Sequence, residues 1–411
     1  MKTAKGLREG FTTGSAATGA ALAALHLLRH GHAPATVRVP LPPFAGGVPR
    51  GHCQLAVDAC SPGPAPELPA LAEQNALLRA AHARIVKDGG DDPDVTTGAH
   101  ITATVLALPE DTPAQDAIRI EGGPGVGRVT LPGLPVPPGQ AAINPVPREQ
   151  MLFALRHALL HPPDPVFRGS LTVIVSVPEG ERLAKKTFNP RLGILGGISI
   201  LGTHGTVRPY SHAAWKATIQ QGLAVAAATG CPLICLTTGR RSERLLMQRY
   251  PHLSASCFLQ VADFAGFSLK KAGALPHKGI VWGCFFGKLL KLAQGHACTH
   301  AHTALLDMAA LAHICRDEGA ACAKTVADCA TAAHALELLL PDPRGQKILL
   351  RVAEQAASHA ARLAGRPVRL HLFHTDGREL LTLCSPQTDA ASTTVMPVPC
   401  RNPHNPQRKS R

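Results

Sequence analysis

The feature that most constrains the fold of this chain is a glycine-rich stretch from Asn189 to Ser211. It is an apolar, strand-like run with five glycines, which allow backbone conformations that larger residues resist: Gly193, Gly196, Gly197, Gly202 and Gly205. A helix is predicted directly after it, because Ser211 is a suitable N-cap and residues 212–228 carry apolar side chains at helical spacing. Gly230 and Pro232 are predicted to end that helix.

A strand, a glycine loop and a helix start in this order indicate a nest. A nest is a concave set of backbone N–H groups, here with the positive end of a helix dipole behind it. Such a nest suits an anion or a carboxylate. The alternative is a tight strand-to-helix connection that binds no ligand, and the stretch alone favours neither interpretation.

Composition limits both the fold and the partner. A chain of 411 residues is long enough for two or three domains, each with its own core. Aromatic residues make up only 4% of the chain, so the core is expected to be mainly aliphatic. Lys and Arg outnumber Asp and Glu by 42 to 28, and this surplus favours an anionic partner. Nucleic acid is disfavoured, because the basic residues are scattered and no stacking aromatics are interleaved with them.

The cysteines and the chain start indicate a cytoplasmic protein without a membrane partner. The twelve cysteines contain no CxxC pair, and several stand in apolar surroundings where a reduced thiol packs as a small hydrophobe. The first residues, MKTAKGLREGF, lead into a polar turn rather than an apolar signal segment. The longest uncharged run contains polar residues, Gly and Pro, so no membrane span is predicted.

Near the N-terminus, Thr12, Thr13 and Ser15 are predicted to cap an alanine-rich helix that ends near Gly31. A helix of small residues can approach a ligand or another backbone closely. The three hydroxyls are therefore candidates for ligand binding, and simple helix capping is the alternative.

Residues 84–105 read as a strand, a turn rich in carboxylates and a second strand. The turn contains Asp88, Asp91, Asp92 and Asp94, which could hold a hard cation or supply a base for a substrate proton. Their spacing does not match a calcium loop. Aspartates beside Gly and Pro are also typical turn formers, and this structural interpretation is the favoured alternative.

A GxGxxG-like string in residues 122–148 does not predict a dinucleotide site, because the residues after it are proline-punctuated and extended rather than helical. The prolines between Pro132 and Pro165 instead favour a domain junction. The predicted division is an N-terminal α+β domain over residues 1–150, an α/β domain with the glycine-rich loop over 151–384, and a basic disordered tail over 385–411. The fold class is therefore α/β, with mixed sheets and helices in two domains.

The second half adds further candidate residues. Lys185 and Lys186 precede the glycine-rich stretch, and Arg240 follows a buried strand. These cations could meet an acidic ligand, although solvated surface cations are commoner. His300 and His302 have a spacing that could bind a metal, but no further ligands stand nearby, so a metal site in the protein is disfavoured.

Five blocks of the chain together resemble the cobalt-precorrin-5B C(1)-methyltransferase family, CbiD, of cobalamin biosynthesis. They are LREGFTTGSAA, VKDGGDDPDVTTGA, GGPGVGRVTLPGLPVPPGQAAINPVPR, AKKTFNPRLGILGGISILGTHGTVRPYS and the region from GKLLKLAQG to CTHAH. The resemblance implies S-adenosylmethionine as methyl donor and an anionic corrin precursor as acceptor. It also implies a fold unlike that of the usual tetrapyrrole methyltransferases, and methylation of ring carbon C-1 of cobalt-precorrin-5B to give cobalt-precorrin-6A.

Roles for individual residues follow as hypotheses from this resemblance. The donor's carboxylate and ribose are assigned to Gly196, Gly197, Ser199, Gly202, Thr203 and Gly205. The acceptor is assigned to Thr12, Thr13, Ser15, Lys185, Lys186 and Arg240, and the base or positioning role to Asp88, Asp91 and His300. No protein-bound metal is expected, because the cobalt belongs to the substrate. Oligomeric state and the metal loading of the substrate stay open.

The chain departs from the family pattern at three positions. Many relatives have Cys where this chain has Ala16, which argues against an obligatory thiol there. Relatives have Thr or Ser in place of His204, and often an acid in place of Arg208. The alternative function is a non-catalytic binder of tetrapyrroles or nucleotides that uses the same basic surface.

Overall fold

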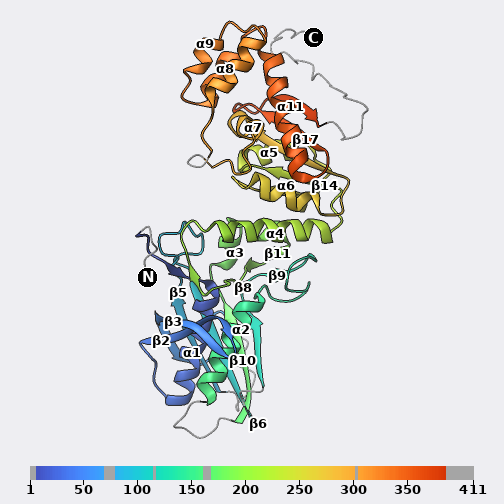
Figure 1. Ribbon diagram of the computed structural model, residues 1–411. Coiled ribbons are helices and arrows are strands. Elements are labelled where there is room, and N and C mark those ends of the chain that lie inside the picture. The colour runs from blue at the N-terminus through green and yellow to red at the C-terminus, as the bar shows by residue number, and fades with distance from the viewer. Residues whose placement is uncertain (1–5, 69–78, 114–116, 161–167, 301–303, 386–411) are drawn as a thin grey trace, which may run out of the picture. The chain divides into compact units, whose positions relative to one another are not determined.

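The computed structural model describes residues 6–68, 79–113, 117–160, 168–300 and 304–385, and it divides the chain into two compact units (Figure 1). The first unit comprises residues 1–214 and the second residues 215–411. This division differs from the boundary predicted after residue 150, which falls inside helix α2 (Pro145–Leu160). Strand β10 (Arg168–Ser176) pairs with two strands of the first unit, so the chain after α2 still belongs to that unit.

The first unit is built on a five-stranded mixed sheet with the order β4-β5-β6-β10-β7. Its neighbours are antiparallel except for the parallel pair β10 and β7. The strands are β4 (Ala59–Pro62), β5 (Arg79–Val86), β6 (His100–Pro113), β7 (Ile118–Gly122) and β10. A separate hairpin is formed by β2 (Thr36–Ala45) and β3 (Val48–Ala56).

Helix α1 (Thr13–His30) packs on this sheet through a face of small side chains. Six of its alanines are fully buried, and a Cβ atom at Gly19 would lie 2.6 Å from Cδ1 of Ile85. Small residues therefore bring the helix close to β5, and α2 packs against α1. The predicted caps are confirmed: Thr12 Oγ1 accepts a hydrogen bond from the Ser15 N–H, and Gly31 is left-handed at the C-cap.

Short strands join the predicted glycine-rich stretch to the rest of the first unit. The stretch contains the 3₁₀ helix η3 (Asn189–Leu192) and the strands β11 (Ile194–Leu195), β12 (Gly197–Ile198) and β13 (Thr206–Val207). They pair with β9 (Arg128–Val129), β8 (Gly125–Val126) and β1 (Gly10–Phe11), respectively. The short helix α3 (Gly180–Ala184) precedes them. The strand-like run, predicted to be broken by a glycine-rich turn, forms two-residue strands; Gly193 precedes β11 and Gly196 lies between β11 and β12, both with positive φ.

The second unit contains a five-stranded sheet with the order β15-β14-β16-β17-β18. The strands are β14 (Leu233–Thr237), β15 (Phe258–Gln260), β16 (Gly279–Phe285), β17 (Val368–Phe373) and β18 (Glu379–Cys384). The first four are parallel and β18 is antiparallel, so strand order reverses between β14 and β16. In open α/β sheets this reversal marks the edge at which ligands commonly bind.

The other regular elements in the described part of this unit are helices. They are α4 (His212–Ala228), α5 (Arg240–Arg249), α6 (Ala265–Gly273), α7 (Phe286–Ala293), α8 (Met308–Asp317), α9 (Ala323–Ala327), α10 (Ala332–Leu339) and α11 (Gly345–Ala364), with the 3₁₀ helix η4 (Ala255–Cys257). Trp282 of β16 is fully buried in the core. The predicted helix after the glycine-rich stretch is confirmed as α4, and Ser211 Oγ accepts from the Ala214 N–H at 3.3 Å.

The predicted fold class, α/β with mixed sheets and helices in two units, is confirmed. No helix within the described ranges is long and apolar enough to cross a membrane. Residues 386–411 of the predicted disordered tail lie outside the described residues. His302 also lies outside them, in the range 301–303.

Candidate functional site

Three of the predicted blocks meet in the first unit, where the start of α1, the aspartate turn and the glycine-rich stretch are joined by backbone hydrogen bonds. The Phe11 N–H donates to the Asp88 carbonyl oxygen at 2.9 Å, and the Thr12 N–H donates to that of Gly205 at 3.0 Å. The Gly14 N–H donates to the Leu201 carbonyl oxygen at 3.1 Å. Residues far apart in the sequence therefore form one local structure, which we call the block junction: residues 8–15, 87–97 and 197–210.

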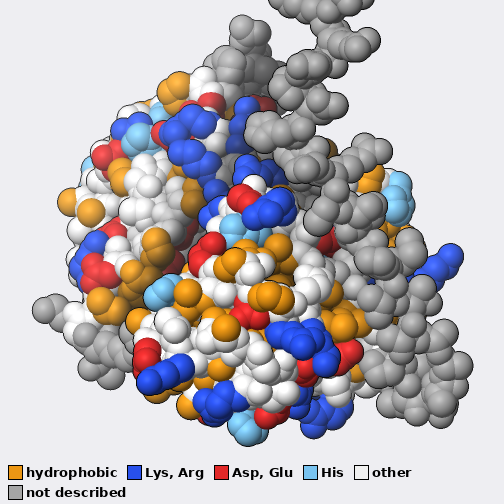
Figure 2. All heavy atoms as spheres, turned by 90° about the horizontal axis from the view of Figure 1, so that it is seen from above, with side chains coloured by type: hydrophobic (Ala, Val, Ile, Leu, Met, Phe, Trp, Pro, Cys, Tyr) orange, Lys and Arg blue, Asp and Glu red, His pale blue; other side chains and the backbone are white. Residues whose placement is uncertain are grey.

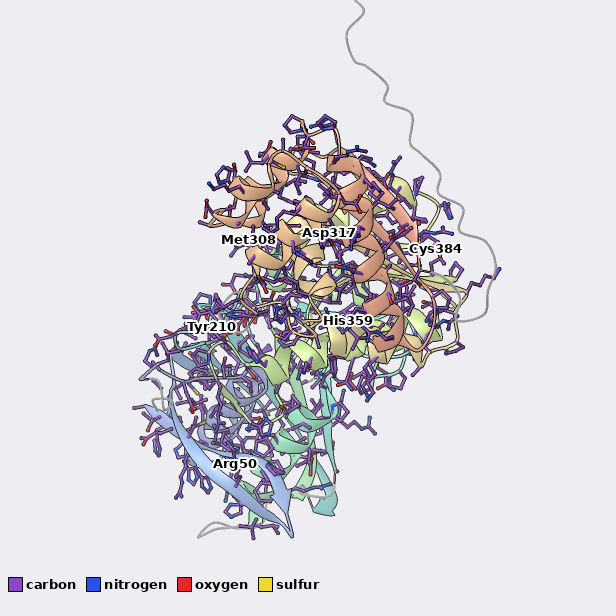
Figure 3. All side chains as sticks on the ribbon, turned by 45° about the horizontal axis from the view of Figure 1, so that its top comes forward. Arg50, Tyr210, Met308, Asp317, His359 and Cys384 are labelled. Carbon is purple, nitrogen blue, oxygen red and sulfur yellow. The ribbon has the colours of Figure 1, made fainter. Side chains whose placement is uncertain are left out.

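The aspartates of the turn hold the N-terminal segment and the end of the glycine-rich stretch. Asp88 forms an ion pair with Arg8, and Asp91 Oδ2 accepts the Arg8 backbone N–H at 2.6 Å. Asp92 Oδ1 accepts the backbone N–H of Tyr210 at 2.9 Å, and Tyr210 is the exposed residue labelled in Figure 3. The Arg8 guanidinium holds the pKa of Asp88 below its ordinary value, which makes this carboxylate a weak base.

A buried ion pair anchors the start of the same turn. The side chain of Lys87 is 1% exposed, and its Nζ donates to Asp94 Oδ2 at 2.6 Å. Asp94 Oδ1 also accepts from the N–H and the hydroxyl of Thr96. Burial alone would raise the pKa of Asp94, but Lys87 and Thr96 together hold it below its ordinary value. Asp94 therefore stays ionised as the counter-charge of Lys87.

The loop of residues 202–205 contains two of the glycines predicted to form a nest, but strand β13 follows it, and α4 starts only at His212. Gly202 and Gly205 have φ values of +143° and +75°, which favour glycine. Within the described chain, no acceptor takes the backbone N–H groups of residues 202–205. Thr203 and His204 are exposed, so this run of N–H groups is open to a carboxylate.

Two further residues assigned to the donor, Gly197 and Ser199, have packing roles, and Gly196 has none. A Cβ atom at Gly197 would lie 2.0 Å from the Gly125 carbonyl oxygen, so β8 and β12 approach too closely for any side chain there. Ser199 is buried, and its hydroxyl donates to Asn189 Oδ1 at 3.4 Å. Gly196 has a φ of +78° and is exposed.

The three hydroxyls predicted to bind substrate are buried and bonded within the protein. Thr13 Oγ1 accepts from the Leu201 N–H at 2.9 Å. Ser15 Oγ donates to the Gly205 carbonyl oxygen at 2.8 Å and accepts from Gln150 Nε2 at 3.0 Å. With Thr12 at the N-cap, these side chains fasten the glycine loop to α1, and their hydrogen-bonding groups face protein. The structure thus favours the capping alternative for them.

Lys185 and Lys186 are exposed immediately after α3. A Cβ atom at Gly180, the first residue of α3, would lie 2.0 Å from the Gly125 carbonyl oxygen, so this helix packs against β8 like β12 does. The two ammonium groups are therefore carried by the same glycine-packed region as the block junction, and they are free to meet solvent or an anionic ligand.

Arg240 and His300 belong to the second unit. Arg240 is exposed at the first residue of α5, directly after the carboxyl end of β14. Near His300, Lys288 contacts Asp263, and its Nζ donates to the Thr299 carbonyl oxygen at 3.1 Å. Burial would raise the pKa of Asp263, but Lys288, Thr299 and His300 hold it below its ordinary value.

Lys288, Asp263 and Thr299 were not among the candidate residues predicted from the sequence. The available signal was that Lys288 and His300 fall in the same recognised block. In the structure, Asp263 follows β15, forms an ion pair with Lys288 in the first turn of α7, and accepts a hydrogen bond from the Thr299 hydroxyl at 3.2 Å. In the part of the chain that is described, no three His, Cys, Asp or Glu side chains are grouped to hold a metal.

Comparison with known proteins identifies the family. Residues 1–209 match the family model CbiD, and residues 298–382 match that of the CbiD C-terminal domain. A cobalt-precorrin-5B C(1)-methyltransferase from Nitratidesulfovibrio vulgaris is 49% identical over 380 residues, which cover 91% of this chain and 92% of the relative. The chain belongs to the CbiD family.

Other relatives carry the same name. The cobalt-precorrin-5B C(1)-methyltransferase of Geobacillus kaustophilus is 44% identical and covers 80% of each chain. A crystal structure of the cobalamin biosynthesis protein CbiD from Archaeoglobus fulgidus matches with 27% identity and a TM-score of 0.34, over 70% of this chain and 79% of that one. The CbiD match over residues 1–209 includes the block junction except for Tyr210.

Proposed function

We propose that this chain is a cobalt-precorrin-5B C(1)-methyltransferase of cobalamin biosynthesis. It transfers the methyl group of S-adenosylmethionine to ring carbon C-1 of its acceptor, cobalt-precorrin-5B, and releases cobalt-precorrin-6A and S-adenosylhomocysteine. The observation that carries the proposal is the 49% identity to a relative of that name over nine-tenths of both chains. The reaction takes place in the cytoplasm, on a substrate that brings its own cobalt.

The chemistry requires positioning more than activation. The sulfonium donor is already an activated electrophile, so the new bond from ring carbon to methyl forms as the sulfur–methyl bond breaks. In-line placement and exclusion of water are the main tasks left to the protein. Four consecutive N–H groups in residues 202–205 fit the donor's carboxylate, because a nest presents several donors to one anion.

The acceptor is a polycarboxylate, and exposed cations are its counterparts. Lys185 and Lys186 are the contacts proposed for the first unit, and Arg240 is proposed separately as an anion contact of the second unit. On the face shown in Figure 2, Lys and Arg side chains lie in several groups separated by apolar and acidic ones.

The base role is divided among the remaining candidates. Asp88 is disfavoured as a base, since its ion pair with Arg8 lowers its pKa. Asp91 is exposed, and one of its oxygens accepts the Arg8 N–H. His300 stands beside the Lys288–Asp263 pair in the second unit. We propose Asp91 and His300 as the groups that remove a proton or place the acceptor.

The test is a methyl-transfer assay under anaerobic conditions. The protein is incubated with S-adenosylmethionine and either cobalt-loaded or metal-free acceptor, and products are identified by mass spectrometry. One added methyl group per acceptor, with equimolar S-adenosylhomocysteine, is expected for the cobalt-loaded form. Binding of both ligands without methylated product under either condition would replace the enzyme by the tetrapyrrole-binding alternative.

A further inference from the structure

Two cysteines meet at the amino-terminal ends of neighbouring strands in the second unit, at the opposite end of β14 from Arg240. Cys231 comes shortly before β14, and Cys257 closes η4 directly before β15. The two strands are parallel neighbours, with Cys235 of β14 opposite Phe258 of β15. Their amino-terminal turns are thereby brought together, and Cys257 Sγ donates a hydrogen bond to Cys231 Sγ at 3.0 Å.

Hydroxyl groups surround the sulfur of Cys231. Its Sγ lies 3.6 Å from Thr229 Oγ1, 3.5 Å from Ser256 Oγ and 3.9 Å from Ser254 Oγ. Burial alone would raise the pKa of Cys231, but the bonds from Cys257 and these hydroxyls bring it below the ordinary value. Burial and the bond to Cys231 raise the pKa of Cys257 to about 11. Cys231 therefore carries the thiolate character, and Cys257 keeps the proton.

The neighbouring thiol of Cys235 differs from that of Cys231 in its surroundings. Cys235 is fully buried on β14, and burial raises its pKa. A buried thiol without polar partners is inert, because the thiolate is the nucleophile. Cys231 is 5% exposed, and Ser254, which contacts both sulfurs, is exposed at the surface. The Cys231 sulfur therefore lies one side chain away from the protein surface.

We propose that Cys231 and Cys257 are an oxidation site, at which a hydroperoxide converts the thiol pair into a disulfide. The Cys231 thiolate attacks one peroxide oxygen; the O–O bond breaks, an S–O bond forms, and the leaving hydroxide takes a proton to become water. The Cys257 sulfur, losing its proton, then attacks the resulting sulfenic acid. An S–S bond forms as the S–O bond breaks, and the oxygen leaves as a second water. Two thiols are oxidised while one hydrogen peroxide is reduced to two waters.

The geometry asks for little movement. A disulfide is about 2.05 Å long, so the two sulfur atoms must approach by about 1 Å. Both residues stand in turns at strand ends rather than inside the ladder, since Cys231 follows Gly230 with its φ of +68° and Cys257 ends the short η4. The strands β14 and β15 keep their pairing while these turns close.

The experiment uses the full chain with Cys384→Ser, because Cys384 is exposed on β18 and would form intermolecular bonds (Figure 3). The reduced protein is treated anaerobically with equimolar hydrogen peroxide, alkylated and digested with trypsin without reductant. Cys257 falls in peptide 250–270, whereas Cys231 and Cys235 share peptide 217–240. The expected product is these two peptides joined and lighter by two hydrogen atoms than their reduced sum.

Variants assign the bond. Cys231→Ser and Cys257→Ser should each abolish the joined peptides, and Cys235→Ser, the matched control, should retain them. Joined peptides that persist in Cys231→Ser, or oxidation confined to other cysteines, would overturn the proposal.

A second measurement does not depend on the folding of the Cys231→Ser or Cys257→Ser variant, because it uses the protein with both cysteines in place. The rate at which iodoacetamide alkylates Cys231 in the reduced protein should have its pH midpoint below that of an ordinary thiol. At pH 7 this rate should be about tenfold or more above that of Cys235. Equal rates for the two residues would remove Cys231 as the attacking thiol and overturn the proposed order of steps.

Discussion

The ion pair between Lys87 and Asp94 is expected to hold the block junction together, and replacing Asp94 by Asn tests this. The substitution keeps the shape of the side chain but leaves the ammonium group of Lys87, whose side chain is 1% exposed, without its counter-charge. Removing one partner of a buried pair costs about 3–5 kcal/mol. For a unit of this size, each kcal/mol lowers the melting temperature by about 2–4 °C, so a drop of about 10 °C is expected.

Calorimetry measures this drop, and the chain offers a matched control. Asp58 and Arg84 form an ion pair of similar length, 2.5 Å, but both side chains are more than a third exposed. Exposed pairs contribute about 0–1 kcal/mol, so Asp58→Asn should change the melting temperature by only a few degrees. Both tryptophans, Trp215 and Trp282, lie in the second unit, and their emission reports on that unit separately. A loss from Asp94→Asn no greater than that from Asp58→Asn would refute the reasoning.

The same pair predicts the pH dependence. The pKa of Asp94 is lower in the folded protein than in the unfolded chain. Its stabilising contribution is therefore complete above the unfolded value of about 3.9 and is lost as the pH falls through the folded value. The difference in melting temperature between wild type and Asp94→Asn should be constant from pH 8 to 5 and shrink below about pH 4. The double variant Lys87→Met with Asp94→Asn should recover stability at pH 7, because it leaves no buried charge unpaired.

Three further predictions concern the ligands. Thr203→Pro removes one N–H from the proposed nest, so it should weaken S-adenosylhomocysteine binding about tenfold or more in calorimetric titration. The control Thr203→Ala keeps that N–H and should bind with unchanged affinity. Equal affinities of the two variants would exclude the nest from the donor site. Acceptor affinity should fall as ionic strength rises while donor affinity changes much less, and equal salt sensitivity would contradict the assignment of scattered cations to the acceptor. Asp91→Asn and His300→Ala test the base role. A lower kcat with unchanged acceptor binding identifies a base, whereas a lower acceptor affinity identifies a positioning residue. Wild-type kinetics in both variants would exclude both residues.

Local signals in the sequence predicted most individual elements correctly. The caps of α1 at Thr12 and Gly31 and the start of α4 after Ser211 follow from side chains that bond their own backbone or tolerate positive φ. The domain boundary could not be read in the same way. Proline punctuation marked residues 132–165, but β10 crosses back to pair with β6 and β7, and pairing across that distance leaves no local signature.

The candidate site was predictable as a set of residues but not as a set of roles. The hydroxyls of Thr13 and Ser15 were read as possible ligand contacts, and the structure uses them to bond Leu201 and Gly205. The aspartate turn was predicted to hold a cation or supply a base, with turn formation as the alternative. In the structure, Asp88 forms an ion pair with Arg8, and Asp94 forms one with Lys87. A sequence shows which polar groups are present, but the fold decides which of them are consumed by partners.

Within the recognised blocks, some glycines are explained by close backbone packing, whereas the N–H groups of one loop are not bonded within the described protein. A Cβ atom at Gly10 would lie 2.2 Å from the carbonyl carbon of Gly89, and one at Gly125 would lie 1.8 Å from the Val177 carbonyl oxygen. These glycines are required because backbone meets backbone, whether or not a ligand is bound. The N–H groups of residues 202–205 differ, since no acceptor within the described chain takes them although Gly205 itself is buried. Close packing therefore accounts for Gly10 and Gly125, and the N–H groups of residues 202–205 are the part of the block junction that we propose for ligand binding.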